Sequence, residues 1–128
     1  MKYMILTYLD EKAWLALSPE QQQAEMELCG PHVQQLIASK KLVDGAPLHP
    51  TATATTLRYR DGKRLVTDGP FAETREQLGG YTIIEADNLD EALAAAKGFL
   101  MPSAVPCTLE LRPIVELSEM PGAKAEKR

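Results

Sequence analysis

The chain has 128 residues, of which 45% are hydrophobic, and a formal net charge of −4. This length suits a single domain with a packed core, and the absence of a basic excess disfavours a nucleic-acid-binding surface. No apolar run approaches the ~20 residues that a membrane-spanning helix requires, and the N-terminus lacks the pattern of a signal peptide. We therefore expect a cytoplasmic globular protein that binds neither nucleic acid nor membrane.

The residues that commonly hold cofactors are few and scattered. Cys29 and Cys107 are far apart in sequence, and neither pairs with His32 or His49 at the spacing of a zinc site. The sequence also contains no glycine-rich nucleotide loop and no metalloprotease or hydrolase motif. We expect no metal and no cofactor, and we expect both thiols to act as small core side chains.

The first segment, Lys2 to Leu9, has the composition of a strand with apolar residues on both alternating sets. Tyr3, Ile5 and Leu9 form one set, and Met4, Leu6 and Tyr8 form the other. A strand with one face in water should alternate with polar residues. This pattern indicates that both faces of the strand are covered.

Two segments have the apolar spacing of helices. The first begins at Ser18-Pro19, where serine can cap the helix and proline suits the first turn, and ends near Ser39. Gly30-Pro31 should break or kink it near residues 27–30. The second helix spans Leu89 to Leu100 and should end before Pro102. Asp10 to Leu17 is compatible with a short helical turn.

The remaining strands are predicted at residues 41–48, 52–60, 63–67, 81–86 and 108–116, with Asp61-Gly62 as the turn of a hairpin. The resulting order is strand, helix, strand, hairpin, strand, helix, strand. It predicts an α+β fold on the ferredoxin-like split β-α-β plan, with an antiparallel sheet and two helices on one face. Residues 1–117 form this domain, and residues 118–128 are predicted to be a flexible tail.

The segment from Arg64 to Tyr81 has the clearest candidate site. Asp68-Gly69-Pro70 specifies a turn after a strand, and such loops on rigid scaffolds often carry function. Phe71 is expected to anchor the loop in the core. Arg75 is the best candidate for binding an anionic substrate, although a solvated arginine is the more usual outcome at such a position. Tyr81 either directs its hydroxyl into the same pocket or simply packs.

The same segment, VTDGPFAETREQLGGY, resembles the signature of the DGPF family, a branch of the YCII-related proteins. MKYMILTYLDEKAW, PTATATTLRYRDGK and LELRPI resemble the same family, so that the similarity covers roughly residues 1 to 115. It implies a dimeric α+β barrel. The apolar open face of the predicted sheet would also be costly to leave in water. We therefore expect a homodimer that forms through this face.

The resemblance also implies a catalytic pair. In YCII-like proteins, a histidine on the first helix and an aspartate before a Pro-Phe turn look like a His–Asp dyad. His32 and Asp68 match these positions. A carboxylate that orients an imidazole makes a usable general acid or base. The alternatives are that His32 is an ordinary half-buried histidine and that Asp68 only caps a turn.

Two functions follow from these residues. The first is a cofactor-independent acid/base enzyme that acts on a small polar or anionic metabolite, with His32 and Asp68 as catalytic residues and Arg75 and Tyr81 as substrate contacts. The alternative is a non-catalytic ligand-binding or regulatory dimer, which the resemblance links to sigma-factor signalling. Whether the protein is an enzyme is left open by the sequence.

Overall fold

The computed structural model describes residues 1–122, so part of the predicted tail, residues 123–128, lies outside the described chain. The elements follow in order as β1 (Lys2–Leu9), α1 (Glu11–Leu15), α2 (Pro19–Glu27), α3 (Gly30–Ala38), β2 (Leu42–Pro47), η1 (Thr51–Thr53), β3 (Thr55–Arg60), β4 (Lys63–Asp68), β5 (Gln77–Glu85), α4 (Leu89–Lys97), β6 (Cys107–Pro113) and η2 (Leu117–Glu119).

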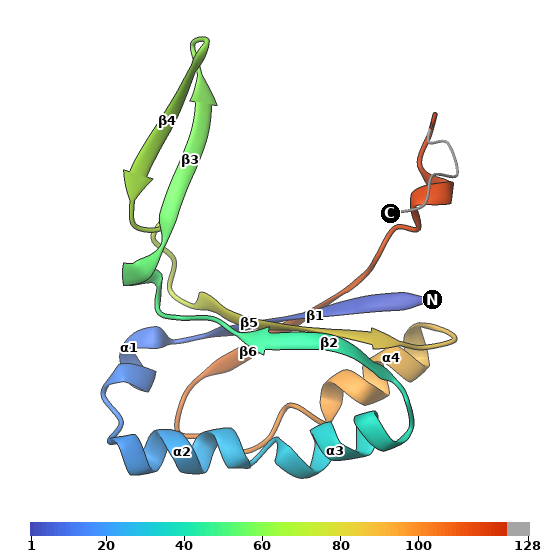
Figure 1. The fold of residues 1–128 in the computed structure, drawn as a ribbon. Coiled ribbons are helices and arrows are strands. Elements are labelled where there is room, and N and C mark those ends of the chain that lie inside the picture. The colour runs from blue at the N-terminus through green and yellow to red at the C-terminus, as the bar shows by residue number, and fades with distance from the viewer. Residues whose placement is uncertain (123–128) are drawn as a thin grey trace.

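The main sheet has four strands in the order β2-β5-β1-β6, and each neighbouring pair is antiparallel. If the β3–β4 hairpin is set aside, this is the strand order of a ferredoxin-like fold, as predicted. The α-helices lie on one face of this sheet (Figure 1). None of the helices in residues 1–122 has the length and hydrophobicity needed to cross a bilayer.

The core lies between one end of the sheet and helices α3 and α4. Tyr3, Ile5 and Ile84 point from the sheet toward these helices and are almost completely buried, together with Leu36 and Ala92. The small alanines on α4 allow this helix to approach the sheet closely. The opposite alternating set on β1 is only half buried, as are Tyr81 and Ile83 on β5.

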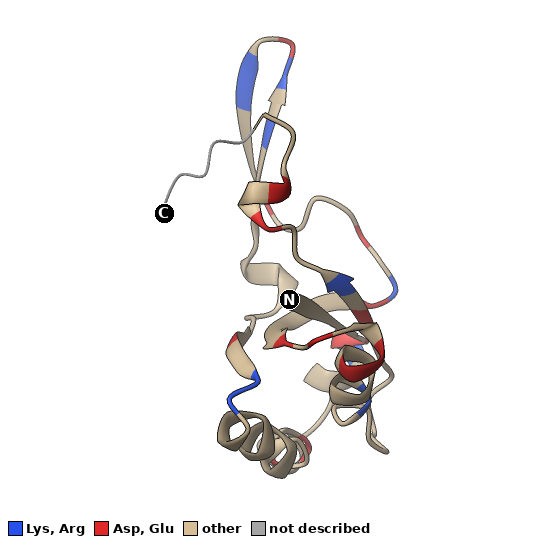
Figure 2. Ribbon diagram, turned by 90° about the vertical axis from the view of Figure 1, so that its right-hand side faces the viewer, with Lys and Arg blue, Asp and Glu red and all other residues tan. Residues whose placement is uncertain are grey.

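The β3–β4 hairpin forms a separate two-stranded sheet that rises from the face opposite the helices (Figure 1). Its turn is Asp61-Gly62, and both residues have positive φ, of 53° and 74°, as the sequence predicts for a tight hairpin. The strands expose large apolar side chains, with Leu57 72% and Tyr59 74% exposed. Basic residues are also visible along the hairpin in Figure 2.

The first long helix is broken in two near Gly30-Pro31, as predicted: α2 ends at Glu27 and α3 begins at Gly30, where the missing N–H of Pro31 is tolerated in the first turn. Two other boundaries differ from those predicted. α4 ends at Lys97, earlier than predicted. β5 begins at Gln77, so that Gly79-Gly80 lies inside a strand and not in the loop.

Candidate functional site

A cavity of about 510 Å³ lies between the sheet and the helices, at the end away from the α3–α4 core. Its floor is made by small residues on the adjacent strands β2 and β5, namely Gly45, Ala46, Gly79 and Gly80. Side chains there are too short to reach the helix layer. The sheet and helices therefore enclose an open space at this end, whereas at the other end Ile5 and Ile84 fill the gap between the two layers.

Glycine is required at Gly45 because two backbones approach closely there. A Cβ built on Gly45 would lie 2.9 Å from the backbone oxygen of Tyr81, a distance that only backbone movement could relieve. A Cβ on Gly79 would lie 2.7 Å from the Leu9 side chain, which would have to shift to make room. The small residues at these positions thus keep the floor of the cavity free of bulky side chains.

The walls of the cavity are mainly apolar. Trp14 of α1, Met26 of α2 and Val33 of α3 contribute from the helices, and Leu9 contributes from β1. The connection from α4 to β6 closes one side, with residues such as Met101. A concave, largely apolar space of a few hundred Å³ with a few polar groups is the usual form of a small-molecule site.

Two carboxylates also line the cavity, and each is held by hydrogen bonds. Glu11 accepts from the backbone nitrogen of Thr51 at 3.0 Å and from its hydroxyl at 2.7 Å. Glu25 accepts from the hydroxyl of Ser103 at 2.6 Å and from the backbone nitrogen of Ala104 at 3.1 Å. These bonds, first that of Ser103, lower the pKa of Glu25 below its ordinary value.

The two cysteines line the same cavity and are not core residues as predicted. Cys29, between α2 and α3, is half exposed, and Cys107, at the start of β6, is exposed. Partial burial is the main reason that the pKa of each thiol is raised above its ordinary value. Both are therefore neutral, weakly nucleophilic groups at neutral pH.

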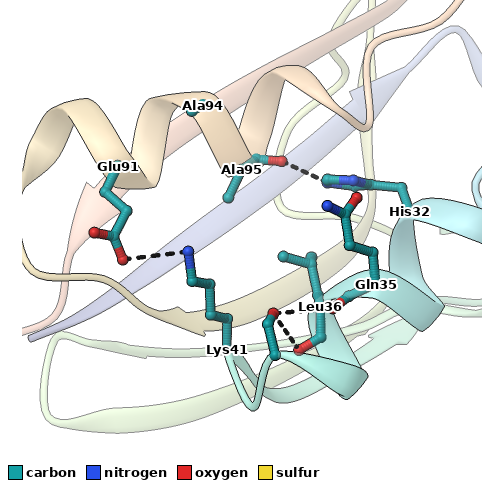
Figure 3. A pocket seen from close by; sticks show the side chains of 8 residues that line it. His32, Gln35, Leu36, Lys41, Glu91, Ala94 and Ala95 are labelled. Carbon is teal, nitrogen blue, oxygen red and sulfur yellow. Dashed lines mark hydrogen bonds and ion pairs between the residues drawn. The ribbon is translucent and has the colours of Figure 1, made fainter.

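His32 lies outside this cavity and joins α3 to α4. Its Nε2 atom is 2.7 Å from the backbone oxygen of Ala95, and its ring meets Phe99 edge-on at 4.7 Å between centroids. Because a carbonyl oxygen only accepts, Nε2 must carry the proton. Figure 3 shows this contact beside a smaller cavity of about 310 Å³, in which Lys41 and Glu91 pair at 3.5 Å.

The structure does not bring His32 and Asp68 together within one chain. Asp68 ends β4, which rises from the opposite face of the sheet from α3 (Figure 1). No hydrogen bond or ion pair between the two residues occurs in residues 1–122. The part of the chain described here likewise holds no group of three or more His, Cys, Asp and Glu side chains that could bind a metal ion.

The other residues predicted for the site are also dispersed. Tyr81 lies in β5 and borders the large cavity, but it pairs with Leu6 in the set that points away from the helices. Arg75 is exposed in the loop after β4. The prediction for Phe71 was wrong, since its side chain is 75% exposed and does not anchor the loop in the core. The loop is instead tied to the hairpin by Arg58, whose guanidinium donates to the backbone oxygen of Phe71 at 2.8 Å.

Sequence reasoning missed most of the cavity. Its walls come from segments far apart in the chain, and residues such as Trp14 and Met26 have no motif. The available signal was the glycine content of two adjacent strands. From the sequence, Gly79-Gly80 belongs to the end of a loop, whereas its strand position, with Gly80 paired to Pro47 of β2 and Thr7 of β1, depends on long-range pairing.

The comparisons with known proteins find similarity along most of the chain. The family model described as the YCII-related domain matches residues 1–118. The uncharacterized protein R00369 of Rhizobium meliloti (strain 1021) is 38% identical over 114 residues, which cover 89% of this chain and 92% of that protein.

Proposed function

The chain belongs to the YCII-related family, and on this premise we propose that it is a small-molecule-binding protein that works as a homodimer. The cavity between the sheet and the helices carries this proposal. Its volume, about 510 Å³, and its mainly apolar walls suit an organic ligand of modest size. This function corresponds to the ligand-binding alternative that the sequence suggests.

The catalytic alternative has less support in the geometry. His32 already uses Nε2 in a hydrogen bond to Ala95 and packs against Phe99, which gives the ring a clear role in joining two helices. Asp68 lies on an element at the opposite face of the sheet. The pair remains a prediction, and the larger cavity offers no histidine to serve as a general base.

The dimer is supported by apolar surface that the single chain leaves uncovered. Met4, Leu6, Tyr81 and Ile83 form a half-buried patch on the sheet face away from the helices. The hairpin rises beside the same face with its own exposed apolar side chains (Figure 1). An isolated two-stranded hairpin is only marginally stable in water. A second copy that covers both the sheet patch and the hairpin would therefore stabilise the two of them.

The cavity can be tested with a neutral apolar probe and a matched pair of variants. Trp14 is the sole tryptophan and lines the cavity, so its fluorescence reports binding of phenylbutanol. Val33→Phe places a larger side chain in the cavity and should weaken binding about tenfold or more. Ile37→Phe adds the same bulk on the exposed side of α3, outside the cavity, and should leave affinity unchanged.

Circular dichroism and thermal unfolding would establish that both variants are folded before their affinities are compared. Equal affinities in Val33→Phe, Ile37→Phe and the unmodified protein would contradict the proposal, because the probe would then bind elsewhere. Absence of any saturable change in Trp14 fluorescence would contradict it as well.

A further inference from the structure

The charge inside the large cavity is of one sign. Among the described residues that line it, Glu11 and Glu25 are the only charged ones, and no Lys, Arg or His is present. The two carboxylates come from different helices, α1 and α2, and so belong to different walls. The other polar lining groups are neutral, and they include the hydroxyl-bearing residues Thr7, Thr82 and Ser103.

The two carboxylates have no countercharge within residues 1–122. The pKa of Glu25 is lowered by its bonds to Ser103 and Ala104, so this group is negative at neutral pH. Within residues 1–122, neither Glu11 nor Glu25 forms a salt bridge with a basic side chain. Each carboxylate has about four acceptor sites, and the hydrogen bonds recorded use two of them on each group.

These observations determine which ligands the cavity should favour. A carboxylate in the ligand would be repelled by two acidic groups of the same sign. An ammonium group would be attracted to the same charges and could donate to their free acceptor sites. The apolar walls would receive the rest of the molecule.

We propose that the ligand is an amphipathic amine, with an apolar body on the walls and an ammonium group at Glu11 or Glu25. The inference rests on the proposed function of the cavity and names its ligand class. It replaces the expectation of an anionic substrate at Arg75, because Arg75 is exposed in a loop and does not line the cavity.

Three probes with the same apolar body separate the charge from the cavity. Phenylbutylamine, phenylbutanol and phenylbutyrate would each be titrated at neutral pH, and dissociation constants measured by calorimetry and by Trp14 fluorescence. A weak ion pair with the amine, together with repulsion between the two glutamates and the carboxylate of phenylbutyrate, predicts that the amine binds about tenfold more tightly than phenylbutyrate. Phenylbutanol should fall between them.

The variants Glu11→Gln and Glu25→Gln then test the carboxylates. Glutamine keeps an acceptor for Thr51 or Ala104 and adds a donor, so the local fold should survive. At least one of these variants should weaken the amine by about threefold, and both should leave phenylbutanol unchanged. A third variant, Glu27→Gln, removes a charge from the exposed surface of α2 outside the cavity and should change neither affinity.

The outcomes distinguish the two proposals. If phenylbutanol binds but the amine gains nothing over phenylbutyrate, the charge selection is overturned while the cavity stands. If the amine preference exists but survives both glutamine variants, the ammonium group lies at neither Glu11 nor Glu25, and the inference is again overturned. If none of the three probes binds, the proposed function fails together with the inference.

Discussion

At the residue scale, the contact between Gly98 and His32 joins α3 to α4. A Cβ built on Gly98 would lie 2.2 Å from the imidazole ring, so glycine is required if the ring is to stay in place. Gly98→Ala should displace the ring and break its bond to Ala95 and its contact with Phe99. These losses amount to about 1–2 kcal/mol, against a gain of about 0.4–1 kcal/mol from a less flexible unfolded chain.

The net expectation for Gly98→Ala is a loss of about 1 kcal/mol in the free energy of unfolding, measured by urea denaturation. A double-mutant cycle provides the control. In a His32→Ala background the clash is absent, so the same Gly98→Ala change should become neutral or stabilising. A loss of similar size in both backgrounds would show that the ring is not what Gly98 accommodates.

The proton on His32 gives a second test at this scale. Because Nε2 donates to the backbone oxygen of Ala95, the neutral ring should be the Nε2–H tautomer, which nitrogen-15 NMR identifies. Asp68→Asn should leave that tautomer and its signals unchanged, with His49 as the internal reference. A change at His32 alone would indicate that Asp68 reaches the ring in the assembled protein, and it would support the predicted catalytic pair.

Single residues were the least predictable feature of the site. Asp61-Gly62 was predicted correctly because a hairpin turn depends on local backbone angles. Phe71 was assigned wrongly because hydrophobicity alone does not say whether a partner surface exists within the same chain. Glu11 and Glu25 were not selected, since acidic residues on a polar helix are ordinarily solvated and only the fold encloses them.

At the scale of elements, local signals predicted the helices better than their packing. Ser18 caps α2, as the sequence suggested, by accepting from the backbone nitrogen of Gln21 at 3.1 Å. The Gln21 side chain accepts in return from the backbone nitrogen of Ser18 at 2.8 Å. The break near residues 27–30 was likewise expected from Gly30-Pro31. These signals act within a few residues and need no tertiary structure.

Strand partners depend on the whole chain and were harder to predict. β5 extends through Gly79-Gly80 because β1 and β2 pair with it on either side, and this pairing outweighs the low strand propensity of glycine. The β3–β4 hairpin was predicted as a pair, but its separation from the main sheet was not. Both features shape the site, since the first provides the cavity floor and the second carries Asp68 away from α3.

At the scale of the whole molecule, the single chain leaves much apolar surface uncovered. Within residues 1–122, only Ile5 and Ile84 have large side chains that are less than 2% exposed. By contrast, Leu57, Tyr59 and Val66 on the hairpin are each more than 60% exposed. Exposed apolar patches of this kind mark interaction surfaces, and the half-buried open face of the sheet lies beside them (Figure 1).

The homodimer that we propose can be tested at one position on that face. Ile83 lies opposite Met4 on the adjacent strand, on the set that points away from the core residues Ile5 and Ile84. Ile83→Asp would place a charge in a dehydrated interface, which costs several kcal/mol when the charge has no partner. Analytical ultracentrifugation should therefore find a dimer for the unmodified protein and a monomer for this variant.

Ile37→Asp is the matched control, because the same substitution on the exposed side of α3 lies on the helical face of the molecule. It should leave the dimer intact. Since an isolated hairpin is marginal, amide exchange in β3 and β4 should also be faster in monomeric Ile83→Asp than in Ile37→Asp. A monomeric unmodified protein whose hairpin is already protected from exchange would mean that the chain stabilises the hairpin alone, and the open face would then require no second copy.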